Sequence, residues 1–354
     1  MPAIKGADVW VLLGPHRGDN NQLLALAESL GIPFRPIHMR YRWFAHLPAV
    51  CRSVTISQLL PEARSEIAPP WPSLVLGIGQ RSAPVARYIK QASGGRTTVV
   101  RLGDPMVSPK LFDLVITTTQ YAVGEAENVV RLPVTITNEP IVPDKAEEHW
   151  LEAFARPRRL IVIGGATSLW RLRPSTIART IRTLQQRVER DGGSVIAVTS
   201  PRTSPGLAAA AQAELGSLAL VDDNFPRYAA LLSAADEIHV TGDSVSMLSD
   251  AIASGKPVGL IPLEPDLTAR FLRLLETIRG RPFRMRDLTK FWDDLRLRGL
   301  VGTIENPRRG MFEIDPLETA LCAVRAAIDE RHPAKVVPAR IRSGRRAPPQ
   351  PAAG

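Results

Sequence analysis

The chain has 354 residues, a formal net charge of +10 and two cysteines. This length predicts about two domains, and an apolar fraction of 44% with 23% charged residues excludes wholesale disorder. Two cysteines exclude a disulfide scaffold and a cysteine-only zinc site, and no apolar run approaches the roughly 20 residues that span a bilayer. We therefore expect a cytoplasmic protein, with peripheral contact at the inner membrane face left open.

The positive charge is concentrated at the carboxyl terminus. Residues 331–354 hold six Lys and Arg, five Pro and no acid, and removing them leaves a net charge of +4. A segment of this composition cannot bury an apolar face, which predicts a disordered basic tail. Because no aromatic residue stands between its charges, we expect no nucleic acid to bind.

Short apolar runs alternate with amphipathic segments in the first part of the chain. Strands are predicted at residues 8–13, 34–39, 73–78, 97–102 and 113–117, with helices at 20–30 and 82–91. Such alternation is typical of a doubly wound parallel α/β domain. A Pro-rich polar stretch then interrupts the pattern, and the first domain is predicted to span 1–148.

A second α/β series follows the interruption. Strands are predicted at 159–163, 194–199, 218–221, 237–241 and 257–261, with a long helix at 175–190. Two such units predict two Rossmann-like domains that face a ligand-binding cleft. The second domain is predicted to span 149–330, and its last helix, at 316–329, is expected to return and brace the first domain.

The most specific motif is TGDSVSMLSDAIASGKPVGLIP, at residues 241–262. Thr241 ends a β-branched strand, and Asp243 or Ser244 is suited to cap the helix that follows. The free N–H groups and the dipole of a helix start favour phosphate. Ser246 adds to a polar cluster that exceeds what a cap requires, so we predict a phosphate site here; a capped helix without a ligand is the alternative.

Two more loops follow predicted strands on the same sheet edge, where ligands bind. Gly164, Gly165, Thr167 and Ser168 combine small residues, which let a ligand approach the backbone, with hydroxyls that bind phosphate. This loop lacks the Gly-Lys-Ser/Thr ending of a P-loop, and a plain tight turn is the alternative. Arg202 is predicted to give a diphosphate its positive partner, unless it is only a surface residue.

The loop at residues 14–20 occupies the corresponding edge of the first domain. His16 or Asp19 is predicted to face the cleft as a general base. The alternatives are a solvated histidine and an aspartate that only caps the next helix. The remaining candidates on this acceptor side are Asn20, Gln80, Arg81, Ser82 and Asp104.

Several cofactor motifs are missing. Gly77 and Gly79 form only a partial dinucleotide fingerprint, because the third glycine is absent. No tyrosine is followed four residues later by lysine, as it is in nicotinamide-dependent sugar epimerases. There is also no Asp-x-Asp pair to hold a diphosphate through a divalent ion, and no His/Cys/carboxylate cluster. We therefore expect phosphate binding by helix termini and arginine, with no metal and no cofactor.

Residues 38–52 interleave aromatic residues with Arg40, Arg42 and Arg52. Such a surface suits contact with anionic lipid headgroups. The alternative is a loop that packs its aromatic side chains on the core.

Four segments together resemble the ELM family, whose plant members are named for mitochondrial fission and whose bacterial members are often labelled nucleoside-diphosphate-sugar epimerases. The resemblance covers about residues 9–310, and the 241–258 segment is its most specific part. The four segments are GDNNQ at 18–22, GQRSAP at 79–84, SPRTSP at 200–205 and TGDSVSMLSDAIASGKPV at 241–258.

The resemblance implies the two-domain glycosyltransferase B architecture, similar to the enzyme that adds N-acetylglucosamine to the peptidoglycan lipid precursor. It implies that the second domain holds a nucleotide sugar and the first holds the acceptor and the base. Asp250 stands where that architecture often carries a glutamate for the ribose. We therefore predict a metal-independent glycosyltransferase that uses a nucleotide-diphosphate sugar and a lipid or envelope acceptor. The alternatives are an epimerase or hydrolase on the same fold, and a non-catalytic adaptor.

Overall fold

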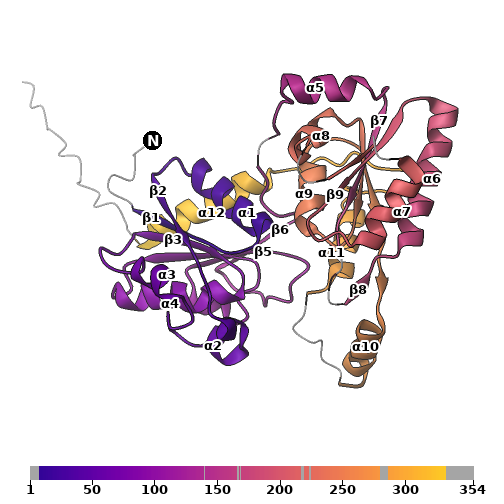
Figure 1. The fold of residues 1–354 in the computed structure, drawn as a ribbon. Helices are drawn as coiled ribbons and strands as arrows, with labels where there is room; N and C mark the ends of the chain where they lie inside the picture. The colour runs from indigo at the N-terminus through magenta and orange to yellow at the C-terminus, as the bar shows by residue number, and fades with distance from the viewer. Residues whose placement is uncertain are drawn as a thin grey trace, which may run out of the picture.

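The structure is a computed structural model that describes residues 8–331, apart from 139, 166, 168, 217–218, 223–224 and 280–285. The predicted basic tail, from residue 332 onward, lies outside the described residues. Two parallel sheets, each covered by helices, form the two halves of the molecule (Figure 1).

The first sheet has six strands in the order β2-β1-β3-β4-β5-β6, all parallel. The central strands are continuous apolar runs because helices cover both of their faces. The short, half-buried strand β6 at the sheet edge was not predicted from the sequence. The strands are β1 (Val9–Leu13), β2 (Phe34–His38), β3 (Leu74–Ile78), β4 (Thr98–Leu102), β5 (Leu114–Thr118) and β6 (Val129–Leu132).

Successive side chains of β1 pack against helices on opposite faces of this sheet. Val11 packs in a core with α1 (Arg17–Ser29) and α12 (Pro316–Arg331), while Trp10 packs in a second core with α3 (Pro61–Ser65) and α4 (Ala83–Ala92). The predicted return of the last helix to the first domain is therefore confirmed. The short helices of this half are η1 (Trp43–His46), α2 (Pro48–Arg52), η2 (Gln80–Ser82) and η3 (Pro109–Leu111).

The two glycines of the partial dinucleotide fingerprint both contact a buried arginine: Gly77 leaves space for its side chain, and Gly79 accepts a hydrogen bond from it. A Cβ on Gly77 would lie 2.4 Å from Nη1 of Arg101, a fully buried side chain of β4. Arg101 donates hydrogen bonds to Oγ of Ser82 (2.8 Å) and to the carbonyl oxygen of Gly79. The glycine pattern thus accommodates the buried guanidinium of Arg101.

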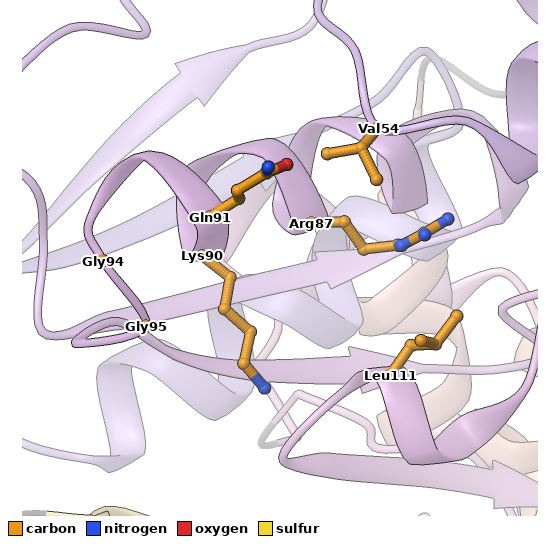
Figure 2. Close-up of a pocket in the computed structure, with 7 residues that line it drawn as sticks. All are labelled: Val54, Arg87, Lys90, Gln91, Gly94, Gly95 and Leu111. Atoms are coloured by element: carbon orange, nitrogen blue, oxygen red, sulfur yellow. The ribbon is translucent and has the colours of Figure 1, made fainter.

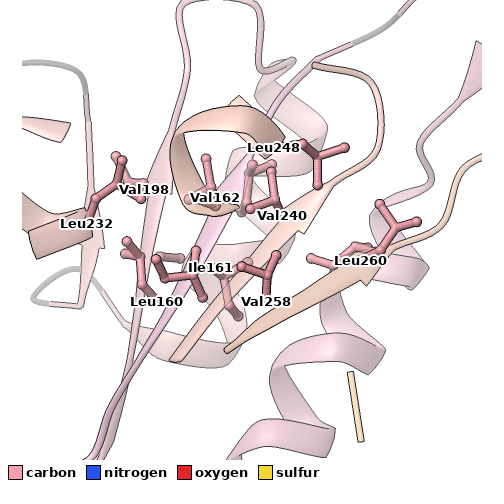
Figure 3. Close-up of a cluster of buried hydrophobic side chains, with 14 of the residues drawn as sticks. Leu160, Ile161, Val162, Val198, Leu232, Val240, Leu248, Val258 and Leu260 are labelled. Atoms are coloured by element: carbon pink, nitrogen blue, oxygen red, sulfur yellow. The ribbon is translucent and has the colours of Figure 1, made fainter. Parts of the chain in front are cut away.

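The second sheet has five parallel strands in the order β10-β9-β7-β11-β12. Its core, part of which Figure 3 shows, includes Val162 of β7, Val240 of β11 and Leu248 of α9. The strands are β7 (Arg158–Ile163), β9 (Ser194–Thr199), β10 (Leu220–Val221), β11 (Glu237–Thr241) and β12 (Val258–Ile261). The helices are α5 (Lys145–Glu152), α6 (Pro174–Asp191), α7 (Pro205–Leu215), α8 (Tyr228–Ala234), α9 (Val245–Ala253), α10 (Leu267–Arg279) and α11 (Leu288–Leu297).

A two-stranded antiparallel ribbon of β8 (Trp170–Arg171) and β13 (Glu264–Pro265) lies at the base of α10. The predicted domain boundary after residue 148 falls inside α5, whose Leu151 belongs to the core of the second sheet. In the link between the halves, the backbone N–H of Thr135 donates to Oγ of Ser249 at 3.0 Å.

The contribution of α12 packing to the stability of the protein can be measured with two substitutions. Ile328→Ala removes a buried side chain of this helix and should lower the free energy of unfolding by about 2–5 kcal/mol. Arg325→Ala, an exposed change on the same helix, should stay within about 0.5 kcal/mol of the parent. Urea unfolding of the full chain compares the two, and equal midpoints would contradict the placement of α12 in the core.

Candidate functional site

A cavity of about 1050 Å³ lies between the two halves, where strands of both sheets end. This volume suits a ligand of nucleotide-sugar size. The structure brings together predicted residues of both domains in the lining. They are His16, Asp19, Gln80, Asp104, Arg202, Asp243, Ser244, Ser246 and Asp250.

A second hollow, of about 400 Å³, lies on the first domain (Figure 2). Its two cations already have partners: Nζ of Lys90 is 2.9 Å from a carboxylate oxygen of Asp113, and Arg87 donates to the carbonyl oxygen of Arg52 at 2.7 Å. The large cavity is therefore the stronger candidate site.

The Asp243 carboxylate joins the loops after three strands of the second sheet. This side chain is fully buried and accepts hydrogen bonds from Oγ1 of Thr241 (2.6 Å), the N–H of Gly165 (2.9 Å) and Nη2 of Arg202 (3.1 Å). Burial raises the pKa of the Asp243 carboxyl, while the surrounding donors oppose that shift. Asp243 thus fixes the position of Arg202, whose side chain stays half-exposed at the cavity.

Gly164 and Gly165 allow this arrangement. A Cβ on Gly164 would lie 2.2 Å from the Asp243 carboxylate, and one on Gly165 would lie 2.0 Å from the carbonyl oxygen of Arg202. The two glycines and Thr167 are outside the cavity lining, and Ser168 lies outside the described residues. In the structure, protein groups occupy the space beside Gly164 and Gly165. A contact between this loop and a ligand remains a prediction.

The start of α9 faces the start of α1 across the cavity. Ser244 caps α9, because its Oγ accepts a hydrogen bond from the N–H of Met247 (3.4 Å). A Cβ on Gly18 would lie 3.2 Å from Oγ of Ser246, so the two helices approach closely. Two helix starts, each with partial positive charge, thus converge on one space.

Two lining residues, Asp250 and Tyr228, have polar side-chain groups that lack a hydrogen-bond partner among the described residues. No described residue donates a hydrogen bond to the Asp250 carboxylate, and burial raises its pKa to about 7. The Tyr228 hydroxyl is buried and also has no hydrogen-bond partner among the described residues. A ligand in the cavity could supply the missing hydrogen bond of the Asp250 carboxylate.

In the first domain, α1 begins at Arg17, three residues before the predicted start. His16 occupies the cap position without a side-chain hydrogen bond, and Asp19 lies in the first turn. The alternative role of Asp19 as a helix cap is therefore wrong. Burial raises the pKa of the Asp19 carboxyl, and the charges of His16, Arg286 and Arg81 act in the opposite direction.

Three acceptor-side candidates are outside the cavity lining and have local partners. Asn20 exchanges two hydrogen bonds with the backbone of Gly14, at 2.8 and 2.9 Å, and so closes the loop before α1. The Ser82 hydroxyl is buried beside Arg101. The Arg81 guanidinium lies over the Tyr41 ring, 4.9 Å from its centre.

Arg286 and Gln120 are cavity residues that sequence reasoning missed. Nε of Arg286 donates to Oε1 of Gln120 at 2.5 Å, and the N–H of Asp287 donates to the Gln120 carbonyl oxygen at 2.8 Å. These bonds join the chain before α11 to the first domain. No local pattern reveals them, because the partners are far apart in the sequence.

Two parallel α/β units that share one cavity at their strand ends define a protein of glycosyltransferase B-type architecture. The chain belongs to the family described as mitochondrial fission ELM1, whose sequence model matches residues 17–301. No curated protein matches the chain. No helix among the described residues has the length and apolar character to span a membrane.

Solved structures similar to the chain include three UDP-N-acetylglucosamine 2-epimerases. The putative enzyme of Listeria monocytogenes is 12% identical, with 91% of this chain and 97% of that chain covered and a TM-score of 0.49. The enzyme of Methanocaldococcus jannaschii is 11% identical, with 90% and 99% covered and a TM-score of 0.48. The enzyme of Neisseria meningitidis, bound to UDP-GlcNAc, is 12% identical, with 91% and 99% covered and a TM-score of 0.45.

The raised pKa of Asp250 predicts a specific pH dependence of stability. The pKa is 3.8 in the reference state and about 7 in the folded protein, so the folded state holds a proton that the unfolded chain has released. The contribution of Asp250 to stability therefore falls as pH rises through this window. Asp250→Asn should raise the free energy of unfolding by about 1–3 kcal/mol above about pH 8 and change it little near pH 4.

Urea unfolding at the two pH values measures this difference. Asp329→Asn, which changes an exposed carboxylate on α12, is the control and should show the same small effect at both. An Asp250→Asn effect that is independent of pH would contradict the predicted shift.

Proposed function

We propose that the cavity binds a nucleotide-diphosphate sugar and that the protein transfers the sugar to an acceptor hydroxyl without a metal ion. The observation that carries this proposal is the convergence of the α9 start, its serines and Arg202 on one cavity of about 1050 Å³. Helix N–H groups, hydroxyls and a guanidinium are together suited to a diphosphate.

In the proposed complex, the diphosphate lies at the start of α9. Ser244, Ser246 and Arg202 contact its oxygens, and the Asp250 carboxyl contacts the ribose. Support comes from the positions of these four groups in one lining and from the Asp243 contact that holds Arg202 in place. The Gly164–Ser168 loop contributes by holding Asp243 and Arg202 and, as predicted from sequence, by contact with phosphate.

The proposed reaction begins with proton transfer from the acceptor hydroxyl to Asp19 or His16. The hydroxyl oxygen forms a bond to the anomeric carbon while the bond from that carbon to the diphosphate oxygen breaks. Arg202 and the α9 dipole stabilise the negative charge on the departing diphosphate. The raised pKa of Asp19 favours this role, because a base works best with a pKa near the working pH. Gln80 and Asp104 are proposed to position the acceptor.

Epimerase or hydrolase chemistry is the second candidate. One observation favours it: carboxyl groups with raised pKa, Asp19 and Asp250, line the same cavity from opposite domains. Such groups can give and take protons near neutral pH. A non-catalytic adaptor is the third candidate, and failure to bind any nucleotide would favour it.

The proposed acceptor is a lipid or an envelope precursor, held by a protein at the inner membrane face. Support comes from the predicted lipid-facing segment at residues 38–52. Its aromatic side chains differ in the structure: Tyr41 and Phe44 are half-buried, whereas Trp43 is exposed. The segment therefore packs on the core in part and presents one large apolar side chain to the surroundings.

The diphosphate site predicts metal-independent binding of UDP. Calorimetry in the presence of a chelator should detect it, and Arg202→Ala should weaken binding by about 1.5–3 kcal/mol, as expected for a hydrogen bond to a charged group. Arg173→Ala is the matched control, because Arg173 is about as exposed as Arg202 and also contacts a carboxylate, Glu264. No nucleotide binding by the parent protein would refute the proposal.

The catalytic assignment is tested with Asp19→Asn and His16→Ala. One of these variants should lose about 10²–10⁴-fold in turnover while binding UDP normally. Glu28→Gln, an exposed change on α1, should retain full activity. Full turnover in both variants would exclude these residues as the base. Tight UDP binding without transfer to any acceptor would favour epimerase or hydrolase chemistry.

A further inference from the structure

We infer that the protein docks on an anionic lipid surface through two exposed apolar elements, one on each domain, that flank the cavity. We call them the first foot (η1 and α2, residues 43–52) and the second foot (α10, Leu267–Arg279). The docking is inferred from surface features alone. What it implies for access of a lipid acceptor to the cavity depends on the proposed function.

The first foot combines large apolar side chains with unopposed positive charge. Trp43 is 79% exposed and Leu47 is 40% exposed, although an isolated protein gains nothing from showing them to water. Arg40, Arg42 and Arg52 around them are exposed as well. The chain contains no acidic residue between positions 28 and 62. Buried Ala45 and Cys51 hold the foot on the domain.

The second foot is an amphipathic helix that projects from the second domain (Figure 1). Leu267, Phe271 and Ile278 are 80%, 59% and 72% exposed. Their spacing places them within roughly 40° of one another around the helix axis, so they form one apolar stripe. Residues 267–286 contain six Arg and a single acidic residue. Oδ1 of Asp266 accepts a hydrogen bond from the N–H of Ala269 (2.7 Å) and fixes the start of the helix.

Both feet extend toward the lower edge of Figure 1, and each is connected to the rim of the same cavity. η1 and α2 pack against η2, of which Gln80 lines the cavity. Along the chain, α10 is followed by Arg286, another lining residue. A flat surface that contacts both feet therefore lies close to the cavity rim.

A lipid surface fits these features better than a protein partner does. An apolar stripe on an arginine-rich helix is the pattern of a helix that lies in the interface, with its apolar face among acyl chains and its charges at anionic headgroups. One plane can contact two separate patches on two domains, whereas a protein would need a shape matched to both. In the proposed reaction, a lipid acceptor would thus reach the cavity without leaving the membrane.

Co-sedimentation of the full chain with vesicles, in the absence of nucleotide, tests the docking. We expect binding to vesicles of equal parts phosphatidylglycerol and phosphatidylcholine and much weaker binding to phosphatidylcholine alone. Trp43→Glu and Phe271→Glu should each weaken binding by about tenfold or more, as expected for loss of one large apolar contact. Because both side chains are exposed, the variants should fold, which thermal unfolding checks.

The matched control is Leu297→Glu, which should bind like the parent chain. Leu297 is 88% exposed and ends α11; the nearby Gly302 donates a backbone hydrogen bond to Val258, at the start of β12 and so at the sheet edge opposite the cavity. Unchanged binding of both foot variants would overturn the proposal and assign any membrane contact to another part of the chain. Equal binding to neutral vesicles would also overturn it.

Two further measurements separate the remaining explanations. If the chain self-associates in light scattering, loses this property in Phe271→Glu and binds no vesicles, the second foot contacts another copy and the proposal fails. UDP calorimetry on the foot variants should match the parent. Vesicle binding without any UDP binding would overturn the proposed function and leave the docking intact.

Discussion

The cavity side of the second domain depends on one buried carboxylate. A fully buried charge is costly unless hydrogen-bond donors surround it, and Asp243 obtains three from Thr241, Gly165 and Arg202. These donors lie at the end of β11 and in the loops after β7 and β9, so the three strand ends have to keep a fixed mutual geometry. A side chain at position 164 would displace the carboxylate and with it the guanidinium at the cavity. The stability of this half and the precision of the site therefore have the same physical origin.

The first domain uses a buried charge of opposite sign in the same way. Arg101 lies in the space left by Gly77 and donates to Ser82 and to the carbonyl oxygen of Gly79. Burial lowers the pKa of Arg101 to about 10, which reflects how little water reaches it. These bonds fix η2 and so place Gln80 at the cavity. In each domain, a glycine-containing segment that looks suited to a ligand is occupied by a protein side chain.

The sequence predicted every strand of the two parallel sheets except β6, because parallel strands with both faces covered require continuous apolar runs. The rule that ligands bind where parallel strands end also predicted that Arg202 and Ser244 share one cavity, whereas Asp250, in the same lining, was predicted from the family resemblance alone. The start of α1 could not be predicted from the sequence, because no side chain caps that helix and Gly18 in its first turn disfavours a helix. The roles of Arg286 and Gln120 in the cavity were not predicted either, because a contact between segments far apart in the sequence leaves no periodic signal.

The return of α12 to the first core means that the polypeptide crosses between the halves twice. The first crossing lies near Thr135, and the second lies in the stretch that leads from the end of α11 to Pro316. A single tether would leave one half free to swivel about it, whereas two tethers define an axis and resist torsion around any other. Opening and closing of the cavity should accordingly be a hinge motion about the axis through the two crossings, in which the same faces of the two domains stay opposite each other.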